Sequence, residues 1–305
     1  MRTRAQDRDK IERVERIASR HYTSEVVSRH DFRIKKNYGQ NFLVDQHVLG
    51  KIIRAADVKS DELIIEIGPG IGALTEELAE NAENVVAIEI DKMLIPILSE
   101  TLADYDNIEI INADILKTDI REIIARYNKK SVKVIANLPY YITTPIVIGL
   151  LQLDGLISRI VVMVQKEVAL RMAAKPGTKD YGSLSLAVQF YSVTTLEANV
   201  PTNCFYPRPG VDSAVIQLDV RKEPPVDVKD ADFMFRIIRA AFSKRRKTLV
   251  NCIESSELMA DFLNGMSKSD IEEIVAQAGL SPKVRGESLD LTAFAKLSDL
   301  ILDKI

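Results

Sequence analysis

The chain has 305 residues, of which 41 are Lys or Arg and 44 are Asp or Glu, so its net charge is −3. A uniformly basic nucleic-acid-binding chain is therefore excluded, and any contact with a polyanion must come from a local basic patch. The length is typical of about two domains of roughly 150 residues each.

Several common classes are excluded by what the sequence lacks. No apolar run approaches the ~20 residues that span a membrane, and the N-terminus has no apolar signal-peptide region. Cys204 and Cys252 form no metal-binding or redox motif. The histidines His21, His30 and His47 have no metal-ligand spacing, so we assign them no role. We expect a soluble cytoplasmic protein that binds neither a membrane nor a metal ion.

The N-terminal arm, residues 1–36, is basic. It carries 11 Lys or Arg and 6 Asp or Glu, a local net charge of +5, whereas the remainder sums to −8. Ile11, Val14, Ile17 and Ala18 fall at helical spacing and predict a short amphipathic helix. Two interpretations remain open: a frayed soluble extension, or an arm that contacts an anionic partner.

Short apolar runs then alternate with amphipathic stretches. The runs are nearly unbroken in Val, Ile, Leu and Ala, which is typical of parallel strands covered on both faces. Strands are predicted at Leu63–Ile67, Val85–Ile88, Ile108–Ile111, Val132–Ala136 and Ile160–Val164, and helices over 72–81, 92–103, 119–127 and 144–153. This alternation predicts an α/β fold with a doubly wound, Rossmann-like and mostly parallel sheet.

The later part of the chain changes character. Two strand-like stretches, about 185–198 and 213–220, have no helical pattern between them and predict an antiparallel pair at one edge of the sheet. Residues 223–231 contain Pro224 and Pro225 and are typical of a linker. Only helical periodicity follows, so we expect an α/β domain over 37–222 and a small all-α C-terminal domain over 232–305.

Polar residues and glycines follow four of the predicted strands. These segments are Glu66–Ile67–Gly68–Pro69–Gly70, Glu89–Ile90–Asp91, Asn112–Ala113–Asp114 and Asn137–Leu138–Pro139–Tyr140. From Gly68 to Glu89 is 21 residues, to Asp114 another 25, and to Asn137 another 23, which is one strand-and-helix unit each time. All four segments should therefore meet at the carboxyl edge of the sheet, where open α/β sheets bind ligands.

The first two segments suit a nucleotide-like ligand. Gly68 and Gly70 permit a tight turn, and Ala73 completes a relaxed form of the dinucleotide-binding pattern. Glu89 stands where an acid accepts from a ribose diol. These two motifs support a nicotinamide enzyme and an S-adenosylmethionine enzyme equally. Asp114 is suited to accept from an adenine amine, or alternatively to cap a helix.

The tetrad Asn137–Tyr140 is more distinctive. Pro139 has no N–H to donate and biases Leu138 toward an extended conformation. A strand end of this kind presents carbonyl oxygens, the Asn137 amide and the Tyr140 ring. The alternative is a simple turn that ends a strand.

In these motifs and several others, the sequence resembles the KsgA-type ribosomal RNA adenine dimethyltransferases. The matching segments are Gly-Gln-Asn-Phe-Leu at 39–43, Glu-Ile-Gly-Pro-Gly at 66–70, Asn-Leu-Pro-Tyr at 137–140, Gln-Lys-Glu-Val at 165–168, Tyr-Gly-Ser-Leu-Ser at 181–185, Phe-Tyr-Pro-Arg-Pro-Gly-Val-Asp-Ser at 205–213 and Arg-Arg-Lys-Thr-Leu at 245–249. They cover about residues 35–290. Ser183, where Arg is common in the family, and the long arm depart from the pattern.

The resemblance implies a class I S-adenosylmethionine-dependent methyltransferase domain and a helical C-terminal domain that binds RNA. It implies cofactor contacts at Asn41, Leu43, Gly68, Glu89, Asp114 and Asn137. The implied substrates are two adjacent adenines near the 3′ end of small-subunit ribosomal RNA, each methylated twice on N6. The implied partner is the small ribosomal subunit, and we expect the chain to act as a monomer.

The tetrad suits this chemistry. Adenine N6 is a poor nucleophile, but the sulfonium methyl is already activated, so orientation is needed rather than a metal or a strong base. The Asn137 side-chain oxygen and the Leu138 carbonyl, set in place by Pro139, would accept from N6, and Tyr140 would stack on the base. Phe205 is a candidate for the opposite face of the base, or alternatively a core aromatic.

A basic run is the candidate RNA contact. It comprises Lys244, Arg245, Arg246 and Lys247. One interpretation is that the run binds phosphates of an RNA whose target base is unstacked. The other is that it forms an ordinary solvated face.

Other functions remain as alternatives. An Erm-type methyltransferase of large-subunit RNA typically carries Ile at the position of Leu138. An assembly or transcription factor could share the fold without catalysis. A nicotinamide oxidoreductase would have no use for residues 137–140. A DNA adenine methyltransferase would carry an Asp/Asn-Pro-Pro-Tyr tetrad and a larger insertion.

Overall fold

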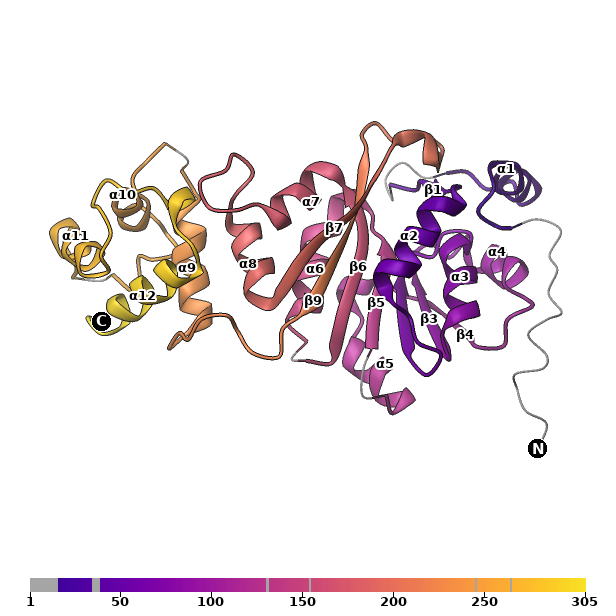
Figure 1. Ribbon diagram of the computed structural model, residues 1–305, viewed down its shortest axis with the longest axis horizontal. Coiled ribbons are helices and arrows are strands. Elements are labelled where there is room, and N and C mark those ends of the chain that lie inside the picture. The colour runs from indigo at the N-terminus through magenta and orange to yellow at the C-terminus, as the bar shows by residue number, and fades with distance from the viewer. Residues whose placement is uncertain (1–15, 35–38, 130–131, 154, 245, 264) are drawn as a thin grey trace. The chain divides into compact units, whose positions relative to one another are not determined.

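The computed structural model describes residues 16–34, 39–129, 132–153, 155–244, 246–263 and 265–305 (Figure 1). Contacts divide the chain into two compact units. Unit 1 comprises the chain up to Ala169 together with Thr195–Val220, and unit 2 comprises Leu170–Thr194 together with Arg221–Ile305.

Unit 1 is built on a seven-stranded sheet with the order β4-β3-β2-β5-β6-β9-β7. The strands are β2 (Leu63–Ile67), β3 (Asn84–Glu89), β4 (Ile108–Asn112), β5 (Val132–Asn137), β6 (Ile157–Gln165), β7 (Ser192–Val200) and β9 (Ser213–Val220). Neighbours from β4 to β6 are parallel, and β9 is antiparallel to β6. The predicted parallel strands and the β9/β7 edge are confirmed, because both faces of the central strands are buried and the runs remain apolar.

Helices alternate with these strands. They are α2 (Gln46–Ala56), α3 (Ala73–Asn81), α4 (Ile95–Thr101), α5 (Ile120–Tyr127), α6 (Thr143–Leu151) and α7 (Lys166–Ala173), with short 3₁₀ turns η3 (Ile115–Lys117), η4 (Tyr140–Ile142) and η5 (Thr202–Cys204). Asp45 and Asp119 begin α2 and α5 by accepting from backbone N–H groups. A separate two-stranded sheet pairs β1 (Phe42–Leu43) with β8 (Phe205–Tyr206). The four predicted helices match α3 to α6.

The predicted strand at 185–198 is wrong over its first half. Residues Ser183–Tyr191 form the helix α8, and β7 begins only at Ser192. Leu184, Leu186, Val188 and Phe190 are all buried, so their alternate spacing imitates a strand on a helix that is covered on most sides. Phe190 packs edge-on against Phe235 at 5.2 Å between ring centroids, which groups α8 with unit 2 instead of the α/β unit.

The rest of unit 2 is helical, as predicted. It contains α9 (Ala231–Ala241), α10 (Leu249–Glu254), α11 (Lys268–Gln277), α12 (Leu291–Leu302) and the turn η6 (Gly286–Ser288) around one apolar core. Residues 221–230 are neither helix nor strand. In the described residues no helix is both long and apolar enough to cross a membrane.

The N-terminal arm differs from its prediction. Ile11 and Val14 lie outside the described residues, while Ile17 and Ala18 precede the helix α1 (Arg20–Arg29) and do not belong to it. Both are buried in the core of unit 1, because the chain here packs onto the α/β fold. The frayed extension is therefore wrong for the described part of the arm.

Candidate active site

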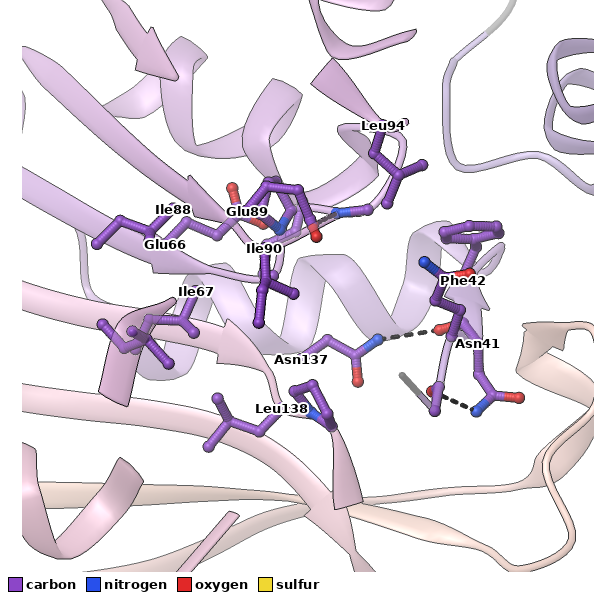
Figure 2. Close-up of a pocket in the computed structure, with 18 of the residues that line it drawn as sticks. Asn41, Phe42, Glu66, Ile67, Ile88, Glu89, Ile90, Leu94, Asn137 and Leu138 are labelled. Carbon is purple, nitrogen blue, oxygen red and sulfur yellow. Dashed lines mark hydrogen bonds between the residues drawn. The ribbon is translucent and has the colours of Figure 1, made fainter. Parts of the chain in front are cut away.

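A pocket open to solvent lies at the carboxyl ends of the parallel strands of unit 1 (Figure 2). It is lined by the ends of β2, β3 and β5, by Ala113 and Asp114 after β4, and by residues 39–43 around β1. The four polar segments of the sequence meet here, as their spacing predicts.

The turn after β2 brings the backbone close to β1. Gly68 and Gly70 have φ of +71° and +63°, a region that residues with a Cβ rarely adopt. A Cβ on Gly70 would lie 2.9 Å from the Phe42 ring. Glycine is therefore required for the loop to form this wall of the pocket.

Glu89 ends β3 and faces this loop. It is 5% exposed, and its carboxylate accepts from the Asp91 N–H at 2.7 Å and from the Gly70 N–H at 3.4 Å. Burial raises the pKa of Glu89 to about 7, although these backbone hydrogen bonds oppose the rise. Near neutral pH its carboxyl therefore exists in both neutral and charged forms.

Glu66, on β2, is a second buried acid at the pocket. Burial raises the pKa of Glu66 to about 8, the Thr75 hydroxyl opposes the rise, and the charge of Glu89 adds to it. Among the described residues, no group hydrogen-bonds to its Oε2 atom, which is fully enclosed. A buried polar atom without a partner is costly, so this carboxyl is suited to a ligand that supplies a donor.

Asp114 lines the pocket and also caps η3. Its Oδ1 accepts from the Leu116 N–H at 3.0 Å, and its Oδ2 lies 3.8 Å from the Lys117 ammonium. Both interpretations of this residue are therefore compatible: one oxygen is engaged in the cap, while the residue still borders the ligand space.

The Asn137 amide is oriented by Asn41, the residue before β1. Its Nδ2 donates to the Asn41 carbonyl at 3.1 Å, which leaves Oδ1 as the atom suited to accept from a ligand (Figure 2). The Leu138 N–H donates to the Met163 carbonyl at 3.0 Å and fixes the peptide that follows. The Pro139 carbonyl is already engaged, since it accepts from the Ile142 N–H and from the Thr143 hydroxyl.

Tyr140 borders the pocket and is half-buried. Its hydroxyl is 2.7 Å from the Ser213 hydroxyl on β9, and either group can donate. Burial raises the pKa of Tyr140, while the Ser213 hydrogen bond opposes the rise. The ring is therefore held at both ends of its side chain, by the tetrad backbone and by Ser213.

Phe205 is the candidate site residue that the structure does not bring to the pocket. It is 1% exposed, lies in β8 opposite Leu43, and belongs to the core of unit 1. Its faces are covered, so it occupies the position of a core aromatic. Leu43, also expected as a cofactor contact, does line the pocket.

The basic run lies in unit 2, in the turn between α9 and α10. Arg245 is outside the described residues, and Lys244, Arg246 and Lys247 are exposed. Lys247 borders a second hollow together with Lys179 and Arg285. Glu287 lines the same hollow, with its carboxylate 3.9 Å from the Arg285 guanidinium, so the hollow carries charges of both signs.

Sequence reasoning missed several pocket residues. Gln40 donates to the buried Asp91 carboxylate at 2.9 Å, and Phe42 packs over the glycine loop. Both lie inside the Gly-Gln-Asn-Phe-Leu segment, but nothing in their spacing indicates the contact. Glu66 could have been found, because an acid inside an otherwise apolar buried strand is unusual.

The mostly parallel sheet, with a glycine loop and acids at the ends of successive strands, has the architecture of a class I methyltransferase, which its similarity to a dimethyladenosine transferase supports. Residues 31–292 match the family described as Ribosomal RNA adenine dimethylase. The chain belongs to this family, and its methyl donor is S-adenosylmethionine.

Two similar proteins are named Ribosomal RNA small subunit methyltransferase A. That of Lachnoclostridium phytofermentans is 53% identical over 285 residues, which are 93% of this chain and 97% of the relative. That of Clostridioides difficile is 48% identical over 293 residues, which are 96% of this chain and 99% of the relative.

Two solved structures are also similar. A dimethyladenosine transferase from Plasmodium falciparum is 28% identical with a TM-score of 0.71, and the match covers 84% of this chain and 95% of that one. The 23S rRNA methyltransferase ErmE is 25% identical with a TM-score of 0.64, and the match covers 86% and 99%.

The pocket fits the methyl donor. S-adenosylmethionine carries an ammonium, a ribose diol and an adenine amine, all of which donate hydrogen bonds. The pocket presents the carboxyls of Glu66, Glu89 and Asp114, and Glu66 Oε2 is enclosed without a partner among the described residues. No group of three or more His, Cys, Asp or Glu in the described part of the chain is arranged to hold a metal ion.

We expect Glu89→Ala to weaken cofactor binding by ~1.5–3 kcal/mol, the range for a hydrogen bond to a charged group. Calorimetric titration with S-adenosylmethionine measures this. Glu109→Ala, an acid on β4 outside the pocket lining, is the control and should bind normally. An unchanged dissociation constant for Glu89→Ala would remove this residue from the site.

Cofactor affinity should rise between about pH 6 and pH 8. The free protein holds protons on Glu66 and Glu89, whose pKa values are about 8 and 7, and a cationic ligand favours their charged forms. If a carboxyl must lose its proton before the cofactor binds, the cofactor affinity falls about tenfold for each pH unit below the pKa of that carboxyl. Calorimetry in buffers of different ionisation enthalpy should detect proton release, and Glu66→Gln should reduce it. Affinity that is flat with pH would contradict this coupling.

Proposed function

We propose that this chain transfers methyl groups to the N6 atoms of two adjacent adenines near the 3′ end of small-subunit ribosomal RNA. The observation that carries the proposal is the Asn137 amide, whose Nδ2 is occupied by the Asn41 carbonyl so that Oδ1 is left to accept from an exocyclic amine. The relatives of 48–53% identity, which are named for the small subunit, support this choice of RNA.

S-adenosylmethionine, when bound, supplies an electrophilic methyl group on a sulfonium. Asn137 Oδ1 and the Leu138 carbonyl accept from N6 and turn its lone pair toward that methyl group. Loss of the methyl group would leave S-adenosylhomocysteine as the second product, and the proton displaced from N6 would pass to solvent. Pro139 holds Leu138 extended, and Tyr140 stacks on the base, so the residues act through orientation.

The basic run of unit 2 is proposed to bind RNA phosphates. Lys244, Arg246 and Lys247 are exposed, and Lys179 and Arg285 border the same hollow as Lys247. Phosphate contacts would hold the substrate, while the adenine must leave its stack to reach the pocket. The partner of this proposal is the small ribosomal subunit, and a monomeric state and a cytoplasmic location remain predictions.

The large subunit is the alternative substrate, because ErmE, a 23S rRNA methyltransferase, shares the fold. The deciding experiment incubates the chain with labelled S-adenosylmethionine and either unmodified small subunits or large subunits, and then maps the modified nucleotides. Label on two adjacent small-subunit adenines supports the proposal, whereas label on large-subunit RNA overturns it.

Variants of the tetrad should distinguish residues that bind the base from residues that bind the cofactor. Tyr140→Ala should lower methylation efficiency about 5- to 150-fold, because base stacking is worth ~1–3 kcal/mol. Tyr140→Phe and Ser213→Ala should each retain most activity and resemble one another, since both remove the same hydrogen bond. Steady-state kinetics and cofactor titration measure this.

Cofactor affinity should survive both Tyr140 variants, whereas Asn137→Ala should impair cofactor binding and turnover together. A Tyr140→Phe enzyme as inactive as Tyr140→Ala would show that the hydroxyl, and not the ring face, is essential.

Replacing Arg245 and Arg246 with Gln should weaken binding of small subunits and reduce the salt dependence by about one slope unit per lost phosphate contact. Binding is measured over a range of salt concentrations. Lys296→Gln with Lys304→Gln, exposed charges of the same unit, is the matched control. Equal slopes for both double variants would identify the basic run as a solvated face.

A further inference from the structure

The described part of the basic arm, residues 16–34, is here called the N-terminal clasp. Its residues Ile17, Val26 and Phe32 are 0%, 0% and 7% exposed, and they join the same core cluster as Ile71 and Leu74 of the pocket wall. The clasp is thus part of unit 1, and its charged side chains contact the helices beside the glycine loop.

The first contact is with α3, which begins directly after the glycine loop. The Ile17 N–H donates to Glu76 Oε2 at 3.1 Å, and Glu76 is 1% exposed in the first turn of α3. The Arg16 guanidinium pairs with Glu80 and lies 4.0 Å from the carboxylates of Glu76 and Glu77. A buried carboxylate is stable only with partners, and the clasp supplies two of them for Glu76.

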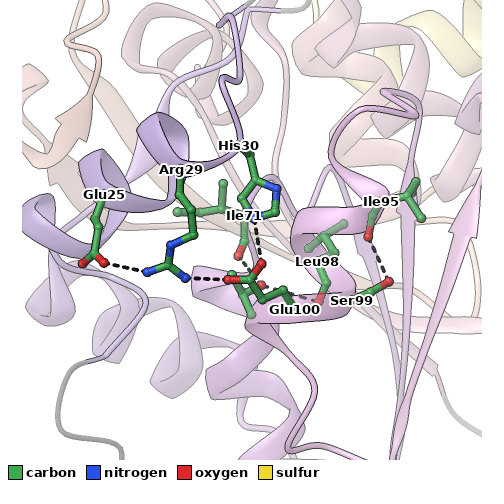
Figure 3. A network of polar contacts seen from close by, with 9 residues as sticks. Glu25, Arg29, His30, Ile71, Ile95, Leu98, Ser99 and Glu100 are labelled. Carbon is green, nitrogen blue, oxygen red and sulfur yellow. Dashed lines mark hydrogen bonds and ion pairs between the residues drawn. The ribbon is translucent and has the colours of Figure 1, made fainter.

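The second contact is with α4 (Figure 3). Arg29 donates to Glu100 Oε1 at 2.6 Å and also to Glu25 at 2.6 Å, and His30 Nε2 lies 2.8 Å from Glu100 Oε2. The next residue, Thr101, donates from its hydroxyl to the Ile71 carbonyl at 2.9 Å. The C-terminal end of α4 therefore contacts the clasp through Glu100 and the glycine loop through Thr101.

The third contact is with β8 and β1, the two-stranded sheet beside the pocket. Arg20 donates to the backbone carbonyls of Asn203 and Phe205 at 2.9 and 3.1 Å, and β8 in turn pairs with β1. Phe32 also packs against Phe42 of β1, with ring centroids 6.3 Å apart. Phe42 is the ring against which the glycine loop closes.

We propose that the N-terminal clasp is a positioning element for the cofactor pocket, acting through α3, α4 and β1 on the glycine loop. Arg29 and Glu100 are then positioning residues that hold the binding-competent arrangement of the loop. The proposal rests on the assignment of this pocket to the cofactor. By thermodynamic linkage, if clasp docking favours the cofactor, then cofactor binding must stabilise the docked clasp to the same extent.

The experiment measures amide hydrogen exchange of the full chain with and without saturating S-adenosylhomocysteine, the methylation product. Exchange of residues 20–29 should slow when the product binds, while exchange of α5 should not change. Arg29→Ala and Glu100→Ala should each raise the dissociation constant and the KM for the cofactor about two- to five-fold, the size expected from an exposed ion pair, with kcat at saturating cofactor retained. The Arg29→Ala/Glu100→Ala double variant should bind the cofactor no more weakly than the single variant with the lower affinity. Arg29→Lys should restore most of the affinity.

A matched control pair lies outside both the clasp and the pocket lining. Arg126 and Glu109 form a pair at 2.8 Å with side chains 51% and 35% exposed, against 51% and 42% for Arg29 and Glu100. Arg126→Ala should leave the cofactor affinity unchanged. Three outcomes would each overturn the proposal. They are clasp variants that bind the cofactor as tightly as the wild type, a control variant that loses as much affinity as the clasp variants, and hydrogen exchange of residues 20–29 that is the same with and without the product. Failure of the wild-type chain to bind the product, or normal binding by Glu89→Ala, would instead overturn the pocket assignment.

Discussion

The whole site depends on the register in which β2 pairs with its two parallel neighbours. Leu63 stands opposite Asn84 of β3 on one side and Val132 of β5 on the other. This register brings the glycine loop beside Glu89 and Asn137, which end the flanking strands. A slip of one residue would turn each of these side chains to the other face of the sheet. Because these strands are buried on both faces, a slip would leave them buried, so burial alone does not specify this register.

Interactions that can be read along the chain were predictable. Unbroken apolar runs mark the parallel strands, and the residues after them mark the ligand edge, so Glu89, Asp114 and Asn137 could be placed in one pocket before any contact was known. Contacts between distant segments were not predictable. The burial of Phe205 depends on its pairing with β1, and α8 imitates a strand because surrounding elements cover most of its sides.

The arm shows a related limit. Its charge suggested an anionic partner outside the protein, but in the described residues Arg16 and Arg29 contact carboxylates of the chain's own helices. The net charge of a segment does not show whether its ionic partners lie on another molecule or on the same chain. Asp114 illustrates the same point on a smaller scale, since a local cap and a place in the pocket are not exclusive.

Domain boundaries drawn from family resemblance and the boundaries of a stable folding unit do not coincide in this protein. The family match begins at residue 31, yet Ile17 and Val26, which precede it, are completely buried in the core of unit 1. A shortened version that starts at the family boundary would therefore expose core residues that pack against Ile17 and Val26, and the exposed apolar surface would favour aggregation. Fragments for expression, fusion or crystallisation should accordingly retain the chain from at least Arg16.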